Sequence, residues 1–168
     1  MVLVDPAKPH VRFDSKRRVI HHPRMRTYPM TIALLLLASL PAAASGLVGK
    51  VVHVQDGDTF TISTAPEGRL VKVRFCGIDT PERGHQGYGE AKSALSRLSY
   101  RQQVRCVQVG QGTPCDGRSK PFSRDRTVAQ CFLGDKDIAA EQVRAGHACD
   151  WSKFSSGHYR VNAQTCVR

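Results

Sequence analysis

Residues 49–78 read GKVVHVQDGDTFTISTAPEGRLVKVRFCGI, and this stretch gives the strongest indication of the fold. It holds three β-rich runs, at residues 49–54, 59–64 and 70–78, and the middle run alternates apolar and polar residues as a strand does. The turn signals QDGD and APEG separate the three runs. The pattern predicts a meander of three strands.

After the third run the period of the apolar residues changes. Beyond a polar loop at residues 83–89, four apolar residues recur at the spacing of one helix face, and they are Ala91, Ala94, Leu95 and Leu98. A second, short helix is predicted over residues 138–145, and Gly146 ends it as glycine usually does.

Two more strands are predicted, over residues 104–109 and 127–133, with a long polar loop at 110–124 between them. Three strands, a helix, two strands and a helix are the layout of a five-stranded OB-fold barrel. We therefore expect a mainly β, α+β domain with two to three helices. The tail from residue 151 onward fits no single pattern.

The N-terminal segment has the parts of a secretory signal peptide. An apolar run at residues 30–40 is too short to span a bilayer, Arg24 and Arg26 precede it, and small residues at 42–44 follow it. Residues 1–44 are thus predicted to be a targeting segment and residues 45–168 the folded domain. A true start at Met25 explains the long leader, and a disordered basic arm is the alternative. We expect export, to a periplasm or out of the cell, with no stable membrane association after cleavage.

The chain is basic, with 25 Lys and Arg against 14 Asp and Glu and a formal net charge of +11. Residues 45–168 remain basic, with 18 Lys and Arg against 12 Asp and Glu. Basic surfaces attract polyanions, so nucleic acid, an anionic membrane and an acidic glycan are candidate partners, and charge alone does not choose among them. A chain of 168 residues suffices for one domain, which we expect to be a monomer.

Six cysteines lie in the predicted domain, and an even count in an exported domain suggests disulfides. They allow 15 connectivities. Cys106 and Cys131 fall in predicted strands that could be neighbours, so this pair is the first we expect. Cys76, in an apolar strand, is alternatively a small buried hydrophobe. The absence of a C-x-x-C pair argues against a zinc site.

Carboxylates gather where the predicted strands end. Asp56 and Asp58 lie in the first turn, and Asp79 and Glu82 follow the third strand. Carboxylate and carbonyl oxygens are the ligands that Ca²⁺ and Mg²⁺ prefer, and the two turns converge if the second and third strands are neighbours. Taken alone, Asp56-Gly57-Asp58 is better explained as ordinary turn chemistry, since Asp-Gly is a favoured hairpin turn.

Two arginines occupy strands that are otherwise apolar. Arg74 lies in the third predicted strand and Arg126 opens the fifth. Arginine forks bind phosphate and stabilise charge that develops on phosphoryl oxygens. The alternative is that both side chains simply point outward from the barrel.

Three sequence blocks together resemble the staphylococcal-type nuclease family. They are VQDGDT at residues 54–59, VRFCGIDTPE at 73–82 and RTVA at 126–129, in the family's order and spacing. The resemblance covers residues 47–151 and implies an OB-fold barrel that cleaves phosphodiester bonds of DNA and RNA with Ca²⁺. It implies contact with the phosphate backbone and little base specificity.

The resemblance also implies a role for each site residue. Asp58 and Asp79 resemble the family's Ca²⁺ carboxylates, and Thr80 resembles the residue that offers its backbone carbonyl to the ion. Glu82 resembles the residue beside the attacking water. Arg74 and Arg126 resemble the catalytic, phosphate-binding arginines.

The chain departs from the family in two places. Arg124-Asp125 stands where the family has Tyr-Gly, and we expect the Asp125 charge to pair with Arg126 and weaken its hold on phosphate. Directly after Gly146 the chain carries His147, Cys149 and Trp151 in place of the tyrosines that some members stack on the nucleotide. Trp151, Phe154 or Tyr159 replaces them or packs in the core.

Three hypotheses follow. The chain is a nuclease, a non-catalytic OB-fold nucleic-acid-binding protein, or an exported structural domain whose charge serves adhesion. Metal-dependent cleavage separates the first from the second, and loss of activity on replacing Arg74 separates the first from the third.

Overall fold

The computed structural model describes residues 46–161, so the predicted signal segment and Cys166 lie outside the described residues. The elements of the barrel are β1 (Leu47–Val54), β2 (Thr59–Thr64), β3 (Leu70–Phe75), β5 (Gln103–Gln108) and β7 (Arg126–Leu133). The helices are α1 (Tyr88–Ser99), α2 (Ile138–Arg144) and α3 (Ser152–Ser155). Four two-residue strands complete the fold: β4 (Ile78–Asp79), β6 (Phe122–Ser123), β8 (Lys136–Asp137) and β9 (Cys149–Asp150).

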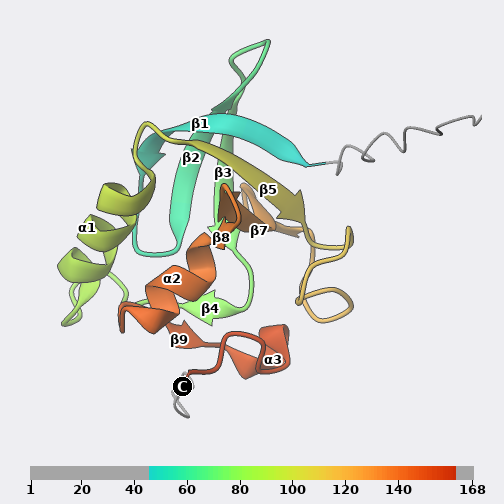
Figure 1. Cartoon of the computed structure of the whole chain (residues 1–168). Helices are drawn as coiled ribbons and strands as arrows, with labels where there is room; N and C mark the ends of the chain where they lie inside the picture. The colour runs from blue at the N-terminus through green and yellow to red at the C-terminus, as the bar shows by residue number, and fades with distance from the viewer. Residues whose placement is uncertain (1–45, 162–168) are drawn as a thin grey trace, which may run out of the picture. The chain divides into compact units, whose positions relative to one another are not determined.

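Five strands close into a barrel in the order β3-β2-β1-β5-β7, and β7 returns to pair with β3 (Figure 1). The pairs along this order are antiparallel, whereas the closing pair β3–β7 is parallel and sets Arg74 opposite Val128. Closure leaves no long unpaired edge among these strands. The predicted five-stranded OB-fold barrel with two to three helices is confirmed.

Apolar side chains from the strands and from two helices meet inside the barrel. Phe60 and Phe75 pack edge to face with ring centroids 5.0 Å apart, and both are buried. Helix α1 buries Ala91 and Leu95, the apolar face that the sequence spacing predicts. Asp137 caps the N-terminus of helix α2: its carboxylate accepts hydrogen bonds from the N–H groups of Ala139 at 2.9 Å and Ala140 at 3.3 Å.

The third strand is shorter than predicted. It ends at Phe75 because Gly77 adopts a left-handed φ of 73° that breaks the extended chain. A side chain at this glycine would also lie 2.8 Å from the Ser155 Cβ atom. The chain resumes as β4, which pairs with β9 instead of continuing the barrel. This break turns Asp79 back toward Arg74.

Two disulfides join described residues. Cys106 and Cys131 lie directly opposite each other on β5 and β7 and are bonded, as predicted from the strands. Cys76, the predicted alternative buried hydrophobe, is bonded to Cys115 in the loop at 110–124. Disulfides suggest an oxidising, extracytoplasmic environment. None of the helices within residues 46–161 is long and apolar enough to cross a membrane.

Candidate functional site

The site begins where β2 and β3 lie side by side. Asp58 immediately precedes β2, and its carbonyl accepts a hydrogen bond of 2.9 Å from the backbone N–H of Phe75. Thr59, the first residue of β2, lies opposite Arg74 on β3. Pairing of these neighbouring strands therefore brings the first turn and the end of the third strand together, as the sequence analysis expected.

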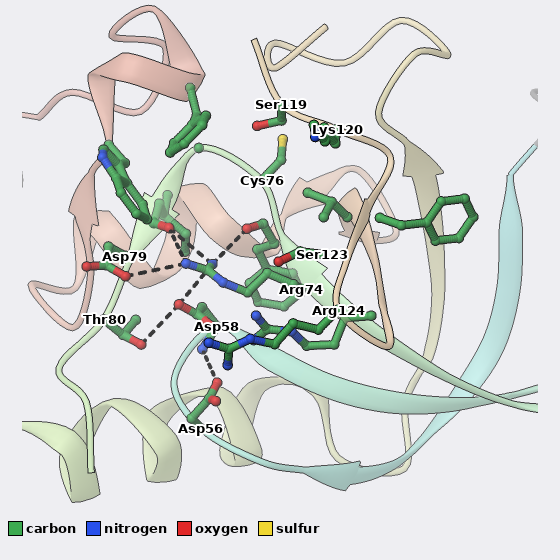
Figure 2. Close-up of a pocket in the computed structure, with 18 of the residues that line it drawn as sticks. Asp56, Asp58, Arg74, Cys76, Asp79, Thr80, Ser119, Lys120, Ser123 and Arg124 are labelled. Atoms are coloured by element: carbon green, nitrogen blue, oxygen red, sulfur yellow. Dashed lines mark hydrogen bonds and ion pairs between the residues drawn. The ribbon is translucent and has the colours of Figure 1, made fainter. Parts of the chain in front are cut away.

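Arg74 lies at the centre of the site, and its guanidinium group contacts several neighbours at once (Figure 2). Its Nη1 lies 2.9 Å from Asp58 Oδ2, and its Nη2 lies 3.3 Å from Asp79 Oδ1. The same two nitrogens donate to the carbonyls of Phe75 and Ile78 at 2.9–3.1 Å. One guanidinium thus pairs with two carboxylates, whose combined charge exceeds its own, and also holds the turned chain between β3 and β4.

The carboxylate of Asp58 is almost fully buried, with 5% of the residue exposed. Burial raises the pKa of Asp58 to about 7; the Arg74 charge acts against this rise, and the neighbouring Asp56 charge adds to it. Asp58 therefore lies in surroundings that favour a second cation beside it.

Thr80 and Gln142 hold the acidic turn in place. The Thr80 hydroxyl donates to Asp58 Oδ2 at 3.3 Å. The buried Gln142 side chain donates from α2 to the carbonyls of Gly57 at 2.8 Å and Ala91 at 3.1 Å. Sequence reasoning missed Gln142, because a glutamine in a short helix is ordinarily an exposed residue.

Arg126 approaches the same site from β7. Its Nη1 lies 3.4 Å from the Thr59 hydroxyl, which itself donates to Asp58 Oδ1 at 2.8 Å. The expected pairing of Asp125 with Arg126 is wrong: Asp125 forms an exposed ion pair with Lys72 on β3. The reason is that Arg126 reaches the Thr59 hydroxyl on β2, whereas Asp125 lies in the exposed turn of the β6–β7 hairpin.

These residues line one pocket of about 670 Å³. All six predicted site residues border it: Asp58, Arg74, Asp79, Thr80, Glu82 and Arg126. Glu82 is exposed, whereas Asp58 and Asp79, the other two carboxylates among these six residues, are buried. The pocket also has residues that the sequence analysis placed only in a polar loop, namely Arg118, Ser119, Lys120, Phe122, Ser123 and Arg124.

The three aromatic candidates separate into two groups. Trp151 and Phe154 line the pocket and pack edge to face, with ring centroids 4.7 Å apart. Tyr159 is 3% exposed and belongs to the apolar core, so core packing is its role. Only the first two can therefore present a ring to a molecule in the pocket.

The chemistry of the donor set fits a hard divalent cation. Asp58 and Asp79 are buried carboxylates that converge on a single guanidinium, and Asp56 adds a third negative charge nearby. Residues 46–161 hold no group of three acidic, His or Cys side chains arranged as a complete metal site. Ca²⁺ binds six to eight oxygens and readily takes backbone carbonyls and water with a few carboxylates, so this set suits it.

Comparison with known proteins identifies a family and several relatives. The family described as "Staphylococcal nuclease homologue" matches residues 72–164. The chain is similar to an "Uncharacterized endonuclease" of Haemophilus influenzae, with 30% identity over 135 residues, 79% of this chain and 69% of the relative.

Two further relatives carry related names. A "Micrococcal nuclease" of Shigella flexneri is 36% identical over 76 residues, 45% of this chain and 42% of the relative. A "Probable endonuclease LCL3" of Meyerozyma guilliermondii is 29% identical over 163 residues, 81% of this chain and 65% of the relative. The chain therefore spans between about two fifths and two thirds of the length of these relatives.

Proposed function

Because the chain belongs to the staphylococcal nuclease family, we propose that it is an exported, Ca²⁺-dependent endonuclease that hydrolyses phosphodiester bonds of DNA and RNA. The observation that carries this proposal is the pocket in which Asp58, Asp79, Glu82, Arg74 and Arg126 meet. Five charged side chains of the types needed for phosphodiester hydrolysis come there from separate parts of the chain.

Ca²⁺ would be held by the carboxylates of Asp58 and Asp79 and by the carbonyl of Thr80. A bound ion supplies positive charge that offsets the anionic phosphate and favours deprotonation of water. The raised pKa of Asp58 supports this assignment, because a buried carboxylate of this kind is stabilised in its ionised form by an adjacent cation.

The reaction needs a proton acceptor and donors for the phosphate. Water attacks phosphorus, a new P–O bond forms, and the bond to the leaving oxygen breaks. Glu82, exposed within the pocket, accepts or orients the proton of the attacking water. Arg126 and Arg74 offer guanidinium donors to the oxygens on which negative charge grows.

The surroundings of the pocket favour substrates recognised by their backbone. Its cationic side chains bind phosphate whatever the base, so we propose activity on both DNA and RNA. The disulfides favour an oxidising compartment, and we propose export through the signal segment at residues 1–44, with residues 45–168 as the active domain. We further propose that this domain acts as a monomer.

The metal assignment is tested by calorimetric titration with Ca²⁺ of Asp58→Asn and Asp79→Asn. Each change keeps the side-chain shape but removes a charge, so we expect Ca²⁺ affinity and cleavage to fall together. Asp135→Asn, in the exposed turn after β7, is the matched control and should bind Ca²⁺ as the wild type does. Unaltered Ca²⁺ binding by both site variants would show that the ion lies elsewhere.

A non-catalytic nucleic-acid-binding role remains the second candidate. The observation in its favour is that Arg118, Lys120 and Arg124 border the same pocket, since binding alone needs only such cations. It predicts affinity for oligonucleotides without cleavage under any divalent ion.

A further inference from the structure

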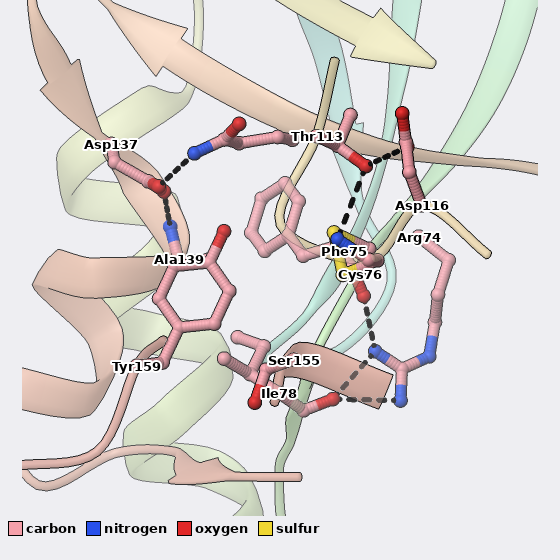
Figure 3. The surroundings of a disulfide bond; sticks show 12 residues. Arg74, Phe75, Cys76, Ile78, Thr113, Asp116, Asp137, Ala139, Ser155 and Tyr159 are labelled. Atoms are coloured by element: carbon pink, nitrogen blue, oxygen red, sulfur yellow. Dashed lines mark hydrogen bonds between the residues drawn. A yellow bond between two sulfur atoms is a disulfide. The ribbon is translucent and has the colours of Figure 1, made fainter. Parts of the chain in front are cut away.

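The loop at residues 110–124, which connects β5 to β7, is fastened at both ends of its pocket-lining part. Cys115, 0% exposed, is bonded to Cys76 directly after β3 (Figure 3). At the other end, Phe122 and Ser123 pair with β7 as strand β6, and the Pro121 carbonyl accepts a hydrogen bond of 2.9 Å from Val128. The stretch between these anchors is therefore held against the pocket.

The one acidic side chain of this loop is satisfied within it. Asp116 accepts hydrogen bonds from the N–H groups of Gly110 at 2.6 Å and Gly112 at 2.8 Å, and from the Thr113 hydroxyl at 2.6 Å. These bonds, that of Thr113 first, lower the pKa of Asp116 to about 2. The Asp116 charge is thus committed to the loop backbone and is not shared with the neighbouring cations.

The cationic side chains of the loop are open to a ligand. Arg118, Lys120 and Arg124 are exposed, and among residues 46–161 none of them has a carboxylate within ion-pair distance. All three nevertheless line the same pocket as Arg74. Figure 2 shows Asp58, Asp79 and Thr80 gathered around Arg74, with Ser119 and Lys120 farther along the pocket.

An exposed aromatic ring lies among these cations. Phe122 is 61% exposed although its neighbours in β7 are buried, and it borders the pocket between Lys120 and Arg124 in sequence. Cations that follow a phosphate backbone and an aromatic face on which a base stacks are the two components of single-strand binding surfaces. The pocket, at about 670 Å³, is also far larger than one phosphate group requires.

We propose that the 110–124 loop is a second substrate-binding surface, which binds the part of a single-stranded polynucleotide beyond the scissile phosphate. Arg118 and Lys120 contact flanking phosphates, Phe122 stacks on a base, and the Cys76–Cys115 disulfide holds the loop in its binding position. The proposal rests on the proposed nuclease function, since it names how that same pocket holds a longer chain.

The first test is binding without cleavage, measured by fluorescence anisotropy of a labelled 16-mer in EGTA over a range of salt concentrations. DNA and RNA of one sequence are compared. Arg118→Gln/Lys120→Gln removes two phosphate contacts, and each contributes about 0.7 to the slope of log affinity against log salt for a single strand. We expect the slope to become shallower by about 1.4. Between 50 and 200 mM salt, the wild type then loses about sevenfold more affinity than the variant does.

The matched control is Lys50→Gln/Arg69→Gln. It makes the same change in net charge at exposed positions that do not border the pocket. A wild-type slope in this control assigns the effect to the loop. An equal loss of slope in both double variants, or none in the loop variant, would overturn the proposal.

The second test concerns the disulfide. Cys76→Ala/Cys115→Ala keeps every cation, so we expect a weaker 16-mer affinity and a shallower slope only if the bond positions the loop. Cys106→Ala/Cys131→Ala removes the barrel disulfide instead and should keep the slope, provided that circular dichroism shows both variants folded. Identical binding by the two variants would exclude the positioning role.

Cleavage of a dinucleotide beside the 16-mer separates this proposal from the proposed function. A dinucleotide has one phosphodiester and does not extend along the loop. We expect the loop variant to raise the KM for the 16-mer at least several times more than the KM for the dinucleotide. If neither substrate is cleaved by the wild type, the nuclease function fails; if both KM values change equally, the loop surface fails.

Discussion

Replacing Arg74 by glutamine tests the electrostatic account of the site. Arg74 is the cation at 2.9 Å from Asp58 and 3.3 Å from Asp79, and all three side chains are at most 14% exposed. Removing one partner from a buried ion pair costs about 3–5 kcal/mol, because the other charge is left uncompensated. We expect the lower end, about 3 kcal/mol, because Arg74 retains some contact with solvent.

The assay is urea unfolding in EGTA, followed by the fluorescence of Trp151, the single tryptophan of the chain. It is repeated with Ca²⁺ at 100 times the dissociation constant, where binding to the folded state adds about 2.7 kcal/mol. In the variant, Ca²⁺ no longer competes with a guanidinium for the carboxylates of Asp58 and Asp79. At a fixed Ca²⁺ concentration the gain in stability should therefore exceed that of the wild type.

Arg74→Lys is the control for charge, since it keeps a cation but not the planar fork that also binds the Phe75 and Ile78 carbonyls. We expect it to fall between the wild type and Arg74→Gln in EGTA. The reasoning is refuted if Arg74→Gln loses less than about 1 kcal/mol, below the range for a buried pair. A smaller Ca²⁺ gain in the variant than in the wild type would refute it as well.

Three other perturbations have definite outcomes. Replacing Cys106 and Cys131 by alanine opens a 25-residue loop and should lower the free energy of unfolding by about 3.5 kcal/mol in a urea titration, so an unaltered midpoint would contradict the entropic account. Gly57→Ala places a Cβ atom 2.7 Å from that of Ala91, and this overpacking should lower the free energy of unfolding by about 1–3 kcal/mol and weaken Ca²⁺ binding. A variant with the urea midpoint and the Ca²⁺ affinity of the wild type would show instead that α1 moves to make room. Asp125→Asn should leave both the melting temperature and the cleavage rate near the wild-type values because its partner is an exposed lysine, and a faster enzyme would restore the idea that Asp125 competes for Arg126.

Local patterns in the sequence were sufficient for most of the barrel. The alternation in residues 59–64 and the turn signals around it gave the first two strands, and β2 is Thr59–Thr64 as predicted. The helix face at Ala91 and Leu95 is the buried face of α1. The Cys106–Cys131 bond followed from two predicted strands, because cysteines directly opposite in neighbouring strands lie at bonding distance.

Long-range features were beyond local patterns. The parallel pairing of β3 with β7 joins residues more than fifty positions apart, and only this closure brings Arg126 beside Thr59 and Asp58. The partner of Asp125 depends on the same closure, since Lys72 lies on β3. Adjacency in sequence suggested Arg126 instead, and the geometry of the hairpin turn decided otherwise.

The loop at residues 110–124 shows a different limit. Its glycines, proline and charged residues are typical of an exposed connection, and no periodicity marks Arg118 or Lys120 as pocket residues. Cys115 was the one available indication, because a disulfide fixes a loop against the segment that holds the partner cysteine. Six cysteines leave too many connectivities for that partner to be deduced from sequence.

The most direct test of the central claim is digestion of single-stranded DNA by the purified protein in Ca²⁺ and in EGTA, beside Glu82→Ala. We predict cleavage in Ca²⁺, none in EGTA, and a rate reduced by about 10²–10⁴ in the variant that lacks the proton acceptor. Binding of the DNA without cleavage under any divalent ion would contradict the claim and identify the chain as a non-catalytic nucleic-acid-binding barrel.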